Sequence, residues 1–265
     1  MNGGIIITII PLISTLLGFY NFLYFITIGY GTSLTFNGLS LIILYYNNLN
    51  TVSFILCIFL IIYGIRLCSY LIIREFFIKS YMEVVKNDIN RINSYSTFIN
   101  LISWLFCSFL YTSLTSPIYF IIINNEQKEL LSSYISIIII FFGFFLEVIA
   151  DHQKTVAKKK NPKKFVSEGL YKIVRCPNYL GEIIMWIGVF LSAIQNYDNI
   201  LQFMISFVGL VTLIFIMFGG ARRFELRQDK NYGDMKDYKI YVSNVPIIIP
   251  FVPLYSVKEY TWLIG

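Results

Sequence analysis

Charged side chains are scarce in this sequence: Asp, Glu, Lys and Arg make up 14% of its 265 residues, against about 25% in an average soluble protein. Apolar residues reach 57%, compared with about 45–50% in soluble domains. A chain of this length cannot hide so much apolar surface in a soluble core. The composition therefore excludes a soluble globular protein and favours one embedded in lipid.

The usual signatures of metal and nucleotide sites are also missing. His152 is the only histidine, and the four cysteines show no metal-ligand spacing, which argues against a zinc or di-iron site. No Gly-rich phosphate loop follows a predicted strand, so we expect no soluble nucleotide-binding domain. The N-terminus lacks a basic region before its apolar run, and we interpret that run as a membrane helix rather than a removable signal peptide.

Long apolar runs dominate what is present. A helix needs about 20 apolar residues to cross the hydrocarbon core. The sequence meets this length near residues 5–27, 51–73, 98–123, 134–150, 179–196 and 200–219. A shorter stretch at 37–47 is marginal. We therefore predict an all-α polytopic membrane helix bundle with about seven spans, or six if 37–47 does not cross.

All the basic residues except Arg66 lie between or after these runs. Of the 21 Lys and Arg, five lie at 66–91, eight at 154–175 and seven at 222–258, which leaves only Lys128 elsewhere. A net charge of +6 would suggest nucleic acid in a soluble protein, but here the clusters are loops on one side of a bilayer, and we expect no nucleic-acid partner. The predicted loops that carry them are 74–97, 151–178 and 220–265. Because cytoplasmic loops carry the excess of Lys and Arg, a cytoplasmic C-terminus is predicted. In a eukaryotic cell we expect the endoplasmic reticulum or another endomembrane.

The C-terminal stretch PIIIPFVPLY at 246–255 is apolar but contains three prolines. Proline removes backbone hydrogen bonds and breaks helices. We interpret this stretch as a segment at the membrane interface rather than as a span.

Polar residues inside apolar runs are candidates for function, because an ionisable group at membrane depth is costly. Glu147 and Asp151 lie one helical turn apart on one predicted helix, and Asn178, Glu182 and Trp186 form a similar stripe on another. Simple alternatives remain for some of them: Asp151 can mark the end of a helix at the membrane surface. Such a role explains Glu182 poorly.

The basic segments suit an anionic ligand as well as a membrane surface. Tyr171 and Arg175 precede the second stripe and would suit headgroup depth. Arg175, Arg222, Arg223 and Arg227 could donate to a phosphate or dinucleotide. Attraction of anionic lipid headgroups is the competing explanation.

Several motifs resemble those of the steroid 5-alpha-reductase C-terminal-domain family, especially its branch of bacterial and protist membrane proteins of unknown substrate. They are YGIRLCSYLIIR (63–74), ADHQK (150–154), GLYKIVRCPNYLGEIIMWIG (169–188) and NYGDMKDYKIY (231–241) with PIIIP (246–250), in the family's order. The resemblance covers roughly residues 60–255. It divides the chain into weakly marked N-terminal membrane helices at 1–50 and a reductase-like membrane domain at 51–265.

The resemblance implies a cofactor pocket open to the cytoplasm and NADPH-dependent reduction of a C=C bond in a lipid or steroid-like substrate within the bilayer. The residues implied to bind the cofactor are Asp151, Arg175, Asn178, Tyr179, Glu182 and Trp186, with Tyr238 and Tyr241 closing the pocket. No catalytic residue is assigned, although Glu147 and the tyrosines are candidates for the proton donor.

One position departs from the family. Where its members commonly read Arg-His-Pro-Asn-Tyr, this chain has Cys176 after Arg175. Loss of that histidine removes a phosphate or ring contact, and the resemblance predicts that histidine at this position is tolerated.

Two other functions fit the same sequence. The Gly-x-Tyr-x-x-x-Arg-x-Pro-x-Tyr-x-Gly pattern also resembles membrane methyltransferases of the isoprenylcysteine or phospholipid type, which use S-adenosylmethionine. Those enzymes usually carry two adjacent glutamates where this chain has Phe224 and Glu225. A noncatalytic lipid-binding or scaffold protein of the same fold is the third alternative.

Overall fold

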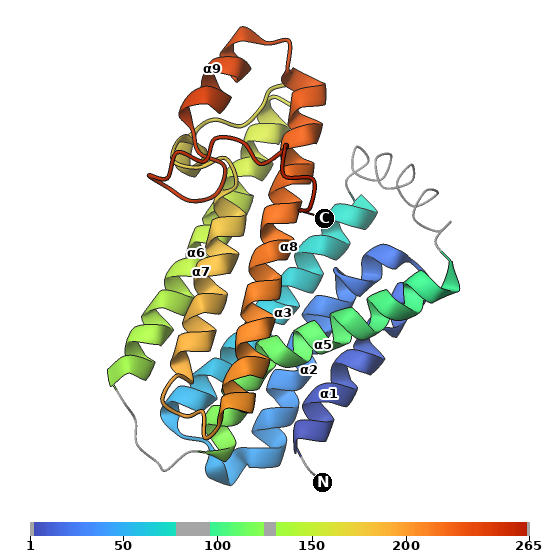
Figure 1. The fold of residues 1–265 in the computed structure, drawn as a ribbon, viewed down its shortest axis with the longest axis vertical. Coiled ribbons are helices and arrows are strands. Elements are labelled where there is room, and N and C mark those ends of the chain that lie inside the picture. The colour runs from blue at the N-terminus through green and yellow to red at the C-terminus, as the bar shows by residue number, and fades with distance from the viewer. Residues whose placement is uncertain (1–2, 78–95, 125–130, 264–265) are drawn as a thin grey trace. The chain divides into compact units, whose positions relative to one another are not determined.

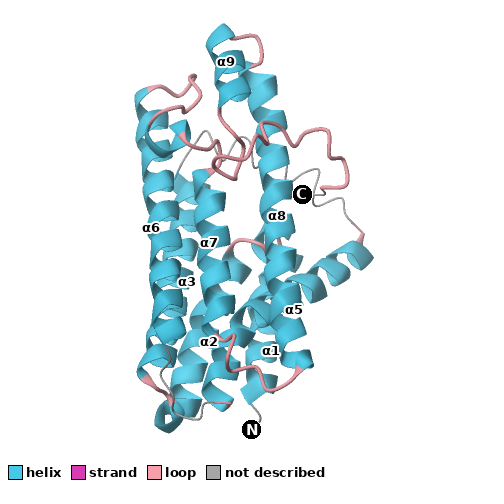
Figure 2. Ribbon diagram, turned by 60° about the vertical axis from the view of Figure 1, so that its left-hand side comes forward, coloured by secondary structure: helices cyan, strands magenta, loops and turns pink. Residues whose placement is uncertain are grey.

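The structure is a computed structural model that describes residues 3–77, 96–124 and 131–263. Its α-helices are α1 (Gly3–Ser14), α2 (Ile28–Tyr45), α3 (Thr51–Phe77), α5 (Thr97–Ile123), α6 (Leu131–Lys160), α7 (Pro177–Ser192), α8 (Ile200–Tyr232) and α9 (Lys236–Asn244) (Figure 1). Short 3-10 helices are η1 (Thr15–Phe19), η2 (Phe22–Phe25), η3 (Tyr46–Asn48) and η4 (Gly169–Lys172). Helices and loops account for all the described residues (Figure 2), and the prediction of an all-α fold is confirmed.

Among the described residues, five stretches are long and apolar enough to cross a bilayer by length and composition. They are Phe22–Asn48, Thr51–Tyr70, Thr97–Ile123, Leu131–Lys160 and Ile200–Tyr232. Two helices are shorter: α1 continues into η1 as the apolar stretch Gly3–Phe19, and α7 has 16 residues. The described helices fit a polytopic membrane bundle, which has seven spans if both shorter helices cross.

The N-terminal spans differ from their predicted bounds. The run at 5–27 was predicted as one helix, but α1 ends at Ser14 and α2 begins at Ile28. Asn21 adopts an extended conformation between them, and its side chain accepts a hydrogen bond from the Leu23 amide. The chain also turns tightly at Gly18, where an added Cβ would lie 2.0 Å from the Phe25 ring. Residues 37–45 are therefore the second half of an 18-residue helix, not a separate marginal span.

Hydroxyl-bearing residues lower the mean hydropathy of α2, so that the sequence alone did not predict it as a full membrane span. Thr32, Ser33 and Thr35 lower its apolar content, yet each hydroxyl donates to a carbonyl four residues earlier in the same helix. Such bonds satisfy the hydroxyls without water. Asn37 is fully buried and donates to the Ile7 carbonyl at 3.3 Å.

Two other predicted loops are partly helical. The spans at 134–150 and 200–219 were predicted to end at the bilayer surface, but α6 continues to Lys160 and α8 to Tyr232. Lys, Arg, Gln and Glu are good helix formers, so the helices persist after the apolar residues end. The span predicted at 179–196 is shorter, since α7 ends at Ser192. Of the basic loop predicted at 74–97, residues 74–77 belong to α3, and residues 78–95 lie outside the described residues, as do residues 125–130 between α5 and α6.

The chain forms two compact units. Unit 1 comprises residues 1–134 and 189–209, and unit 2 comprises residues 135–188 and 210–265. The division falls inside α6, α7 and α8, whereas the boundary inferred at residue 50 rests on resemblance and is not tested by packing.

Close helix contacts in unit 1 occur at glycines. A Cβ added to Gly64 of α3 would lie 2.4 Å from the Gly31 carbonyl of α2, and one added to Gly38 would lie 2.8 Å from the Cys57 carbonyl. Small residues let membrane helices approach closely, which strengthens packing where water cannot drive association.

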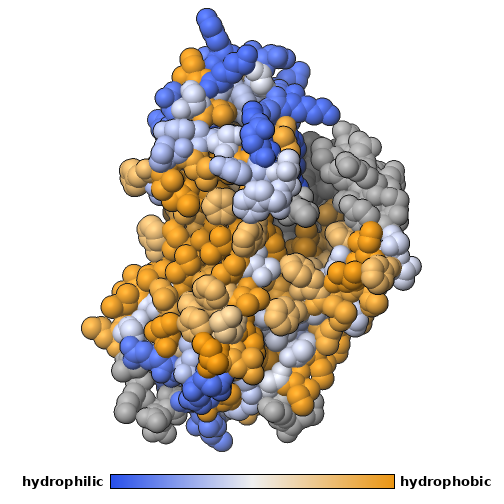
Figure 3. All heavy atoms as spheres, viewed as in Figure 1, coloured by the Kyte–Doolittle hydropathy of each residue, from blue (hydrophilic) through white to orange (hydrophobic). Residues whose placement is uncertain are grey.

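Unit 2 is built on α6, α7 and α8, with α9 and the C-terminal segment at one end. A Cβ added to Gly143 of α6 would lie 2.5 Å from the Met185 amide nitrogen of α7, and one added to Gly181 would lie 2.7 Å from the Glu147 nitrogen. The two helices run side by side in both ribbon views (Figures 1 and 2). The end of unit 2 that carries α9 is hydrophilic, whereas the helices below it present hydrophobic atoms (Figure 3).

Candidate functional site

The hydrophilic end of unit 2 brings together the motifs that are separate in the sequence. ADHQK lies on α6, GLYKIVRCPNYLG leads into α7, and NYGDMKDYKIY joins α8 to α9. Gln153 connects the first two motifs, because its side chain accepts a 2.9 Å hydrogen bond from the Leu170 amide. The adjacent Gly169 has a φ of +63°, a conformation that costs glycine little. Sequence reasoning did not single out Gln153, although its place in a quoted motif was a signal.

The two predicted polar stripes lie on helices in direct contact. Glu147 is only 5% exposed, and its backbone nitrogen faces Gly181, the residue before Glu182. Asp151, Asn178 and Glu182 are partly exposed, and Trp186 is buried. The structure therefore brings carboxylates of α6 and α7 to the same helix pair.

Arg175 holds the C-terminal segment in place. Its guanidinium forms a 2.9 Å ion pair with Glu225 of α8, and both side chains are at most 2% exposed. It also donates to the Tyr255 carbonyl, while the other Glu225 oxygen accepts from the Val257 amide at 2.8 Å. In this arrangement the Arg175 charge is directed to a protein carboxylate. The Glu225 role was not predicted from the sequence.

The backbone beside this ion pair adds two further bonds. The Arg175 amide donates to the Pro246 carbonyl and the Cys176 amide to the Ile247 carbonyl, both at 2.9 Å. The segment after α9 is thereby fixed against the residues that precede α7.

Tyr238 and Tyr241 hold α9 to the rest of unit 2. The Tyr238 hydroxyl donates to Asp229 at 2.8 Å, and the Tyr241 hydroxyl donates to the Tyr171 carbonyl at 2.7 Å. Burial raises the pKa of both phenols, and Asp229 raises the pKa of Tyr238 further. Both are therefore neutral at physiological pH. Phe165 packs between them, with its ring centroid 5.3 Å from each.

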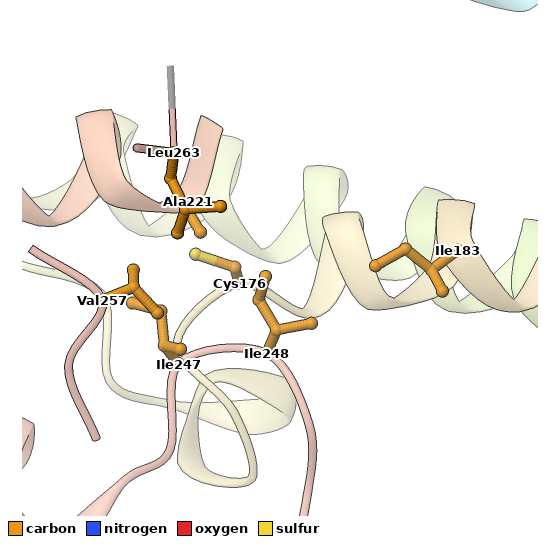
Figure 4. Close-up of a cluster of buried hydrophobic side chains, with 7 residues drawn as sticks. All are labelled: Cys176, Ile183, Ala221, Ile247, Ile248, Val257 and Leu263. Carbon is orange, nitrogen blue, oxygen red and sulfur yellow. The ribbon is translucent and has the colours of Figure 1, made fainter. Parts of the chain in front are cut away.

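Cys176 lies in an apolar cluster rather than beside a polar ligand site. It is 2% exposed, and its sulfur points toward Ala221, with Ile247, Ile248 and Val257 around it (Figure 4). Burial raises the pKa of the thiol to about 12. The thiol is therefore protonated and serves packing.

This packing revises the expectation that histidine is tolerated at position 176. We expect Cys176→His to destabilise the protein, since an overpacked core side chain costs about 1–3 kcal/mol and a buried imidazole needs hydrogen-bond partners. Thermal unfolding in detergent measures the effect. Cys176→Ala is the control and should unfold near the wild-type temperature. A Cys176→His protein as stable as Cys176→Ala would contradict a packing role for Cys176 in the apolar cluster.

Three cationic side chains interact electrostatically with residues at the start of α7. Arg223 and Arg227 of α8 act electrostatically on the Tyr179 hydroxyl, and both are exposed. Lys154 of α6 acts on the neighbouring Cys176 and lies 5.3 Å from the centroid of the Phe224 ring. These cations would attract an anionic group to this end of α7, although the amides of Arg175 and Cys176 are already bonded to the C-terminal segment.

The predicted site residues thus divide into two groups. Asp151, Asn178, Tyr179 and Glu182 lie near the cationic end of α7 with partly exposed side chains. Arg175, Trp186 and Tyr238 are buried, and the hydroxyl of Tyr241 is engaged within the protein. Among the described residues, no group of three or more His, Cys, Asp or Glu side chains is placed to hold a metal ion.

No curated protein and no solved structure matches the chain. Residues 13–245 match a family described as protein of unknown function, DUF1295. The match spans most of the chain, including the helix pair and the cationic end of α7, and the protein therefore belongs to the DUF1295 family.

Proposed function

We propose that this protein is an integral membrane oxidoreductase that reduces a C=C bond of a lipid or steroid-like substrate with NADPH. The observation that carries the proposal is the positive charge at the start of α7, where Arg223 and Arg227 act electrostatically on Tyr179 and Lys154 acts on Cys176. The resemblance of the surrounding motifs to the steroid 5-alpha-reductase family supports it. By the positive-inside rule, this end of unit 2 faces the cytoplasm, where NADPH is supplied.

The ion pair of Arg175 with Glu225 changes which residues we assign to the dinucleotide phosphate. Arg175 is occupied by Glu225, so we assign phosphate binding to Arg223 and Arg227, whose exposed guanidinium groups can donate two parallel hydrogen bonds to one phosphate. Asn178 and Glu182 lie one and two turns into α7 and would contact the ribose or nicotinamide amide.

The chemistry requires a proton as well as a hydride. When bound, NADPH supplies the hydride for one alkene carbon, and the other carbon receives a proton, which yields a saturated product. A carboxyl group in an apolar site can donate such a proton. Glu147 is our candidate, because it is buried on α6 one turn deeper than Asp151 and faces the α7 backbone beside Glu182. The apolar surfaces of α6 and α8 would admit a lipid-like substrate from the bilayer.

Thermal unfolding with NADPH and with S-adenosylmethionine in parallel tests the proposal, since a ligand that binds only the folded state raises its stability. We expect NADPH to raise the unfolding temperature of the detergent-purified protein, with no shift from S-adenosylmethionine. A shift with S-adenosylmethionine alone would identify a methyltransferase. No shift with either would favour a noncatalytic protein of this fold.

Asn178→Ala and Glu182→Ala are each expected to weaken NADPH binding by about tenfold, the effect of losing roughly 1.4 kcal/mol of contact, while membrane insertion is retained. Titration of purified protein with NADPH measures the affinity. Asp198→Ala removes an exposed carboxylate beyond the other end of α7 and is the matched control. If both variants bind NADPH with unchanged affinity, Asn178 and Glu182 do not contact the cofactor and have structural roles.

A further inference from the structure

The C-terminal segment of unit 2 forms a pocket outside the proposed cofactor site. Its volume is about 420 Å³. The walls come from the residues before α7, the end of α9 and the segment at 246–255, and they include Lys172, Ile173, Asn244, Phe251 and Val252. None of the lining residues is acidic.

Exposed apolar side chains form the rim of this pocket. Phe251 is 98% exposed, Ile173 50% and Val252 42%. Isolated exposed apolar residues are ordinary, but a contiguous patch on one edge of a pocket marks a surface that contacts something apolar.

The backbone at Phe251 reinforces this interpretation. Its φ is +65°, a conformation that is uncommon for residues with a side chain and unusual for a bulky one. Residues kept in such conformations cluster where a binding site requires them. Here the residue in this conformation is Phe251, whose side chain is almost fully exposed.

The depth of the segment follows from its hydrogen bonds. Pro246 and Ile247 accept from the amides of Arg175 and Cys176, the two residues before α7 enters its apolar run at Pro177. The segment is therefore fixed at the level where a membrane helix leaves the hydrocarbon, which is the headgroup region. The Trp262 ring, 6.0 Å from that of Phe215 on α8, suits the same depth, where aromatic residues are enriched.

Charge and polarity identify the occupant. Lys172 supplies a cation and Asn244 an amide, while Ile173, Phe251 and Val252 supply apolar surface. An anionic headgroup joined to an acyl chain matches both parts.

We propose that this pocket binds one anionic phospholipid of the cytoplasmic leaflet, with its phosphate at Lys172 and its glycerol and upper acyl chain against Ile173, Phe251 and Val252. Phe251 inserts into the membrane interface beside it. The lipid holds the C-terminal segment against the membrane. The same segment is also hydrogen-bonded to Arg175 and Glu225. This site is separate from the proposed cofactor site and would exist in a protein without catalytic activity.

The first test measures whether Phe251 lies in lipid. Phe251→Cys and Met235→Cys proteins are labelled with an environment-sensitive fluorophore and reconstituted in nanodiscs that contain headgroup-nitroxide lipids. Met235 is an exposed apolar residue between α8 and α9 and is the matched control; wild-type protein gives the background from native cysteines. We expect strong quenching at position 251 and at least threefold less at position 235. Equal quenching at both positions, or none at 251, would overturn the proposal.

The second test measures the ligand. Phosphatidylserine should raise the unfolding temperature of delipidated protein in detergent more than phosphatidylcholine does, and glycerol 3-phosphate should have no effect because it lacks the acyl chain. Lys172→Gln should abolish the difference between the two lipids, whereas Lys236→Gln, which removes an exposed cation from α9, should preserve it. A response to glycerol 3-phosphate would instead identify a soluble phosphate site, and an unchanged lipid preference in Lys172→Gln would overturn the assignment of the headgroup.

Discussion

Replacing Glu225 by alanine is expected to cause one of the largest losses of stability available in unit 2. The change leaves the Arg175 guanidinium, 2% exposed, without its carboxylate, and breaking a buried ion pair from one side costs about 3–5 kcal/mol. It also removes the acceptor of the Val257 amide, so the C-terminal segment loses an anchor. Thermal unfolding measures the stability, and hydrogen exchange at residues 246–257 measures the release of the segment.

A double replacement separates the charge effect from general damage. Arg175→Met with Glu225→Leu removes both charges and keeps apolar volume, and such replacements are often neutral or stabilising. We expect it to recover much of the loss in Glu225→Ala. If Glu225→Ala unfolds at the wild-type temperature, the ion pair does not hold the segment as we describe.

The second large effect is expected at Gly181, where α6 and α7 meet. A Cβ at this position would lie 2.7 Å from both the Glu147 nitrogen and the Gly143 carbonyl. These are backbone atoms, so Gly181→Val must separate the helices and should cost at least the roughly 1–3 kcal/mol typical of overpacking. The helix pair carries Glu147 and Glu182, and NADPH affinity should fall together with thermal stability.

Gly220→Ala is the matched control on α8. Its Cβ would lie 3.4 Å from the Tyr179 ring, an ordinary van der Waals separation, and we expect the variant to unfold near the wild-type temperature. Equal stability of Gly181→Val and wild type would mean that α6 and α7 are farther apart than the structure places them.

Composition and apolar runs were sufficient to predict the fold class and most helices. They failed at the N-terminus because apolar residues continue through the break between Ser14 and Ile28, so a window average cannot detect it. They undervalued α2 for the opposite reason: its hydroxyls are satisfied inside the helix, and their cost in lipid is smaller than a hydropathy scale assigns.

The candidate site was predictable in place but only partly in detail. The two stripes of polar residues were predicted from their spacing, whereas the direct contact between the helices that carry them was not and is seen only in the structure. The ion pair and hydrogen bond of Arg175 could not be predicted, because the partners of Arg175, which are Glu225 and Tyr255, are 50 and 80 residues away in the sequence. A sequence motif shows that an arginine is present but not whether it faces a ligand or a buried carboxylate.

Equilibrium titration of the purified protein with NADPH tests the central claim most directly. The compared proteins are wild type, Arg223→Gln with Arg227→Gln, and Lys236→Gln with Lys239→Gln, where the last pair removes equal charge from the exposed face of α9. We predict saturable binding to wild type and to the α9 variant, and at least tenfold weaker binding to the α8 variant, because a hydrogen bond to a charged group contributes about 1.5–3 kcal/mol. Equal loss in both double variants, or no binding to wild type, would contradict a dinucleotide site at the N-terminus of α7.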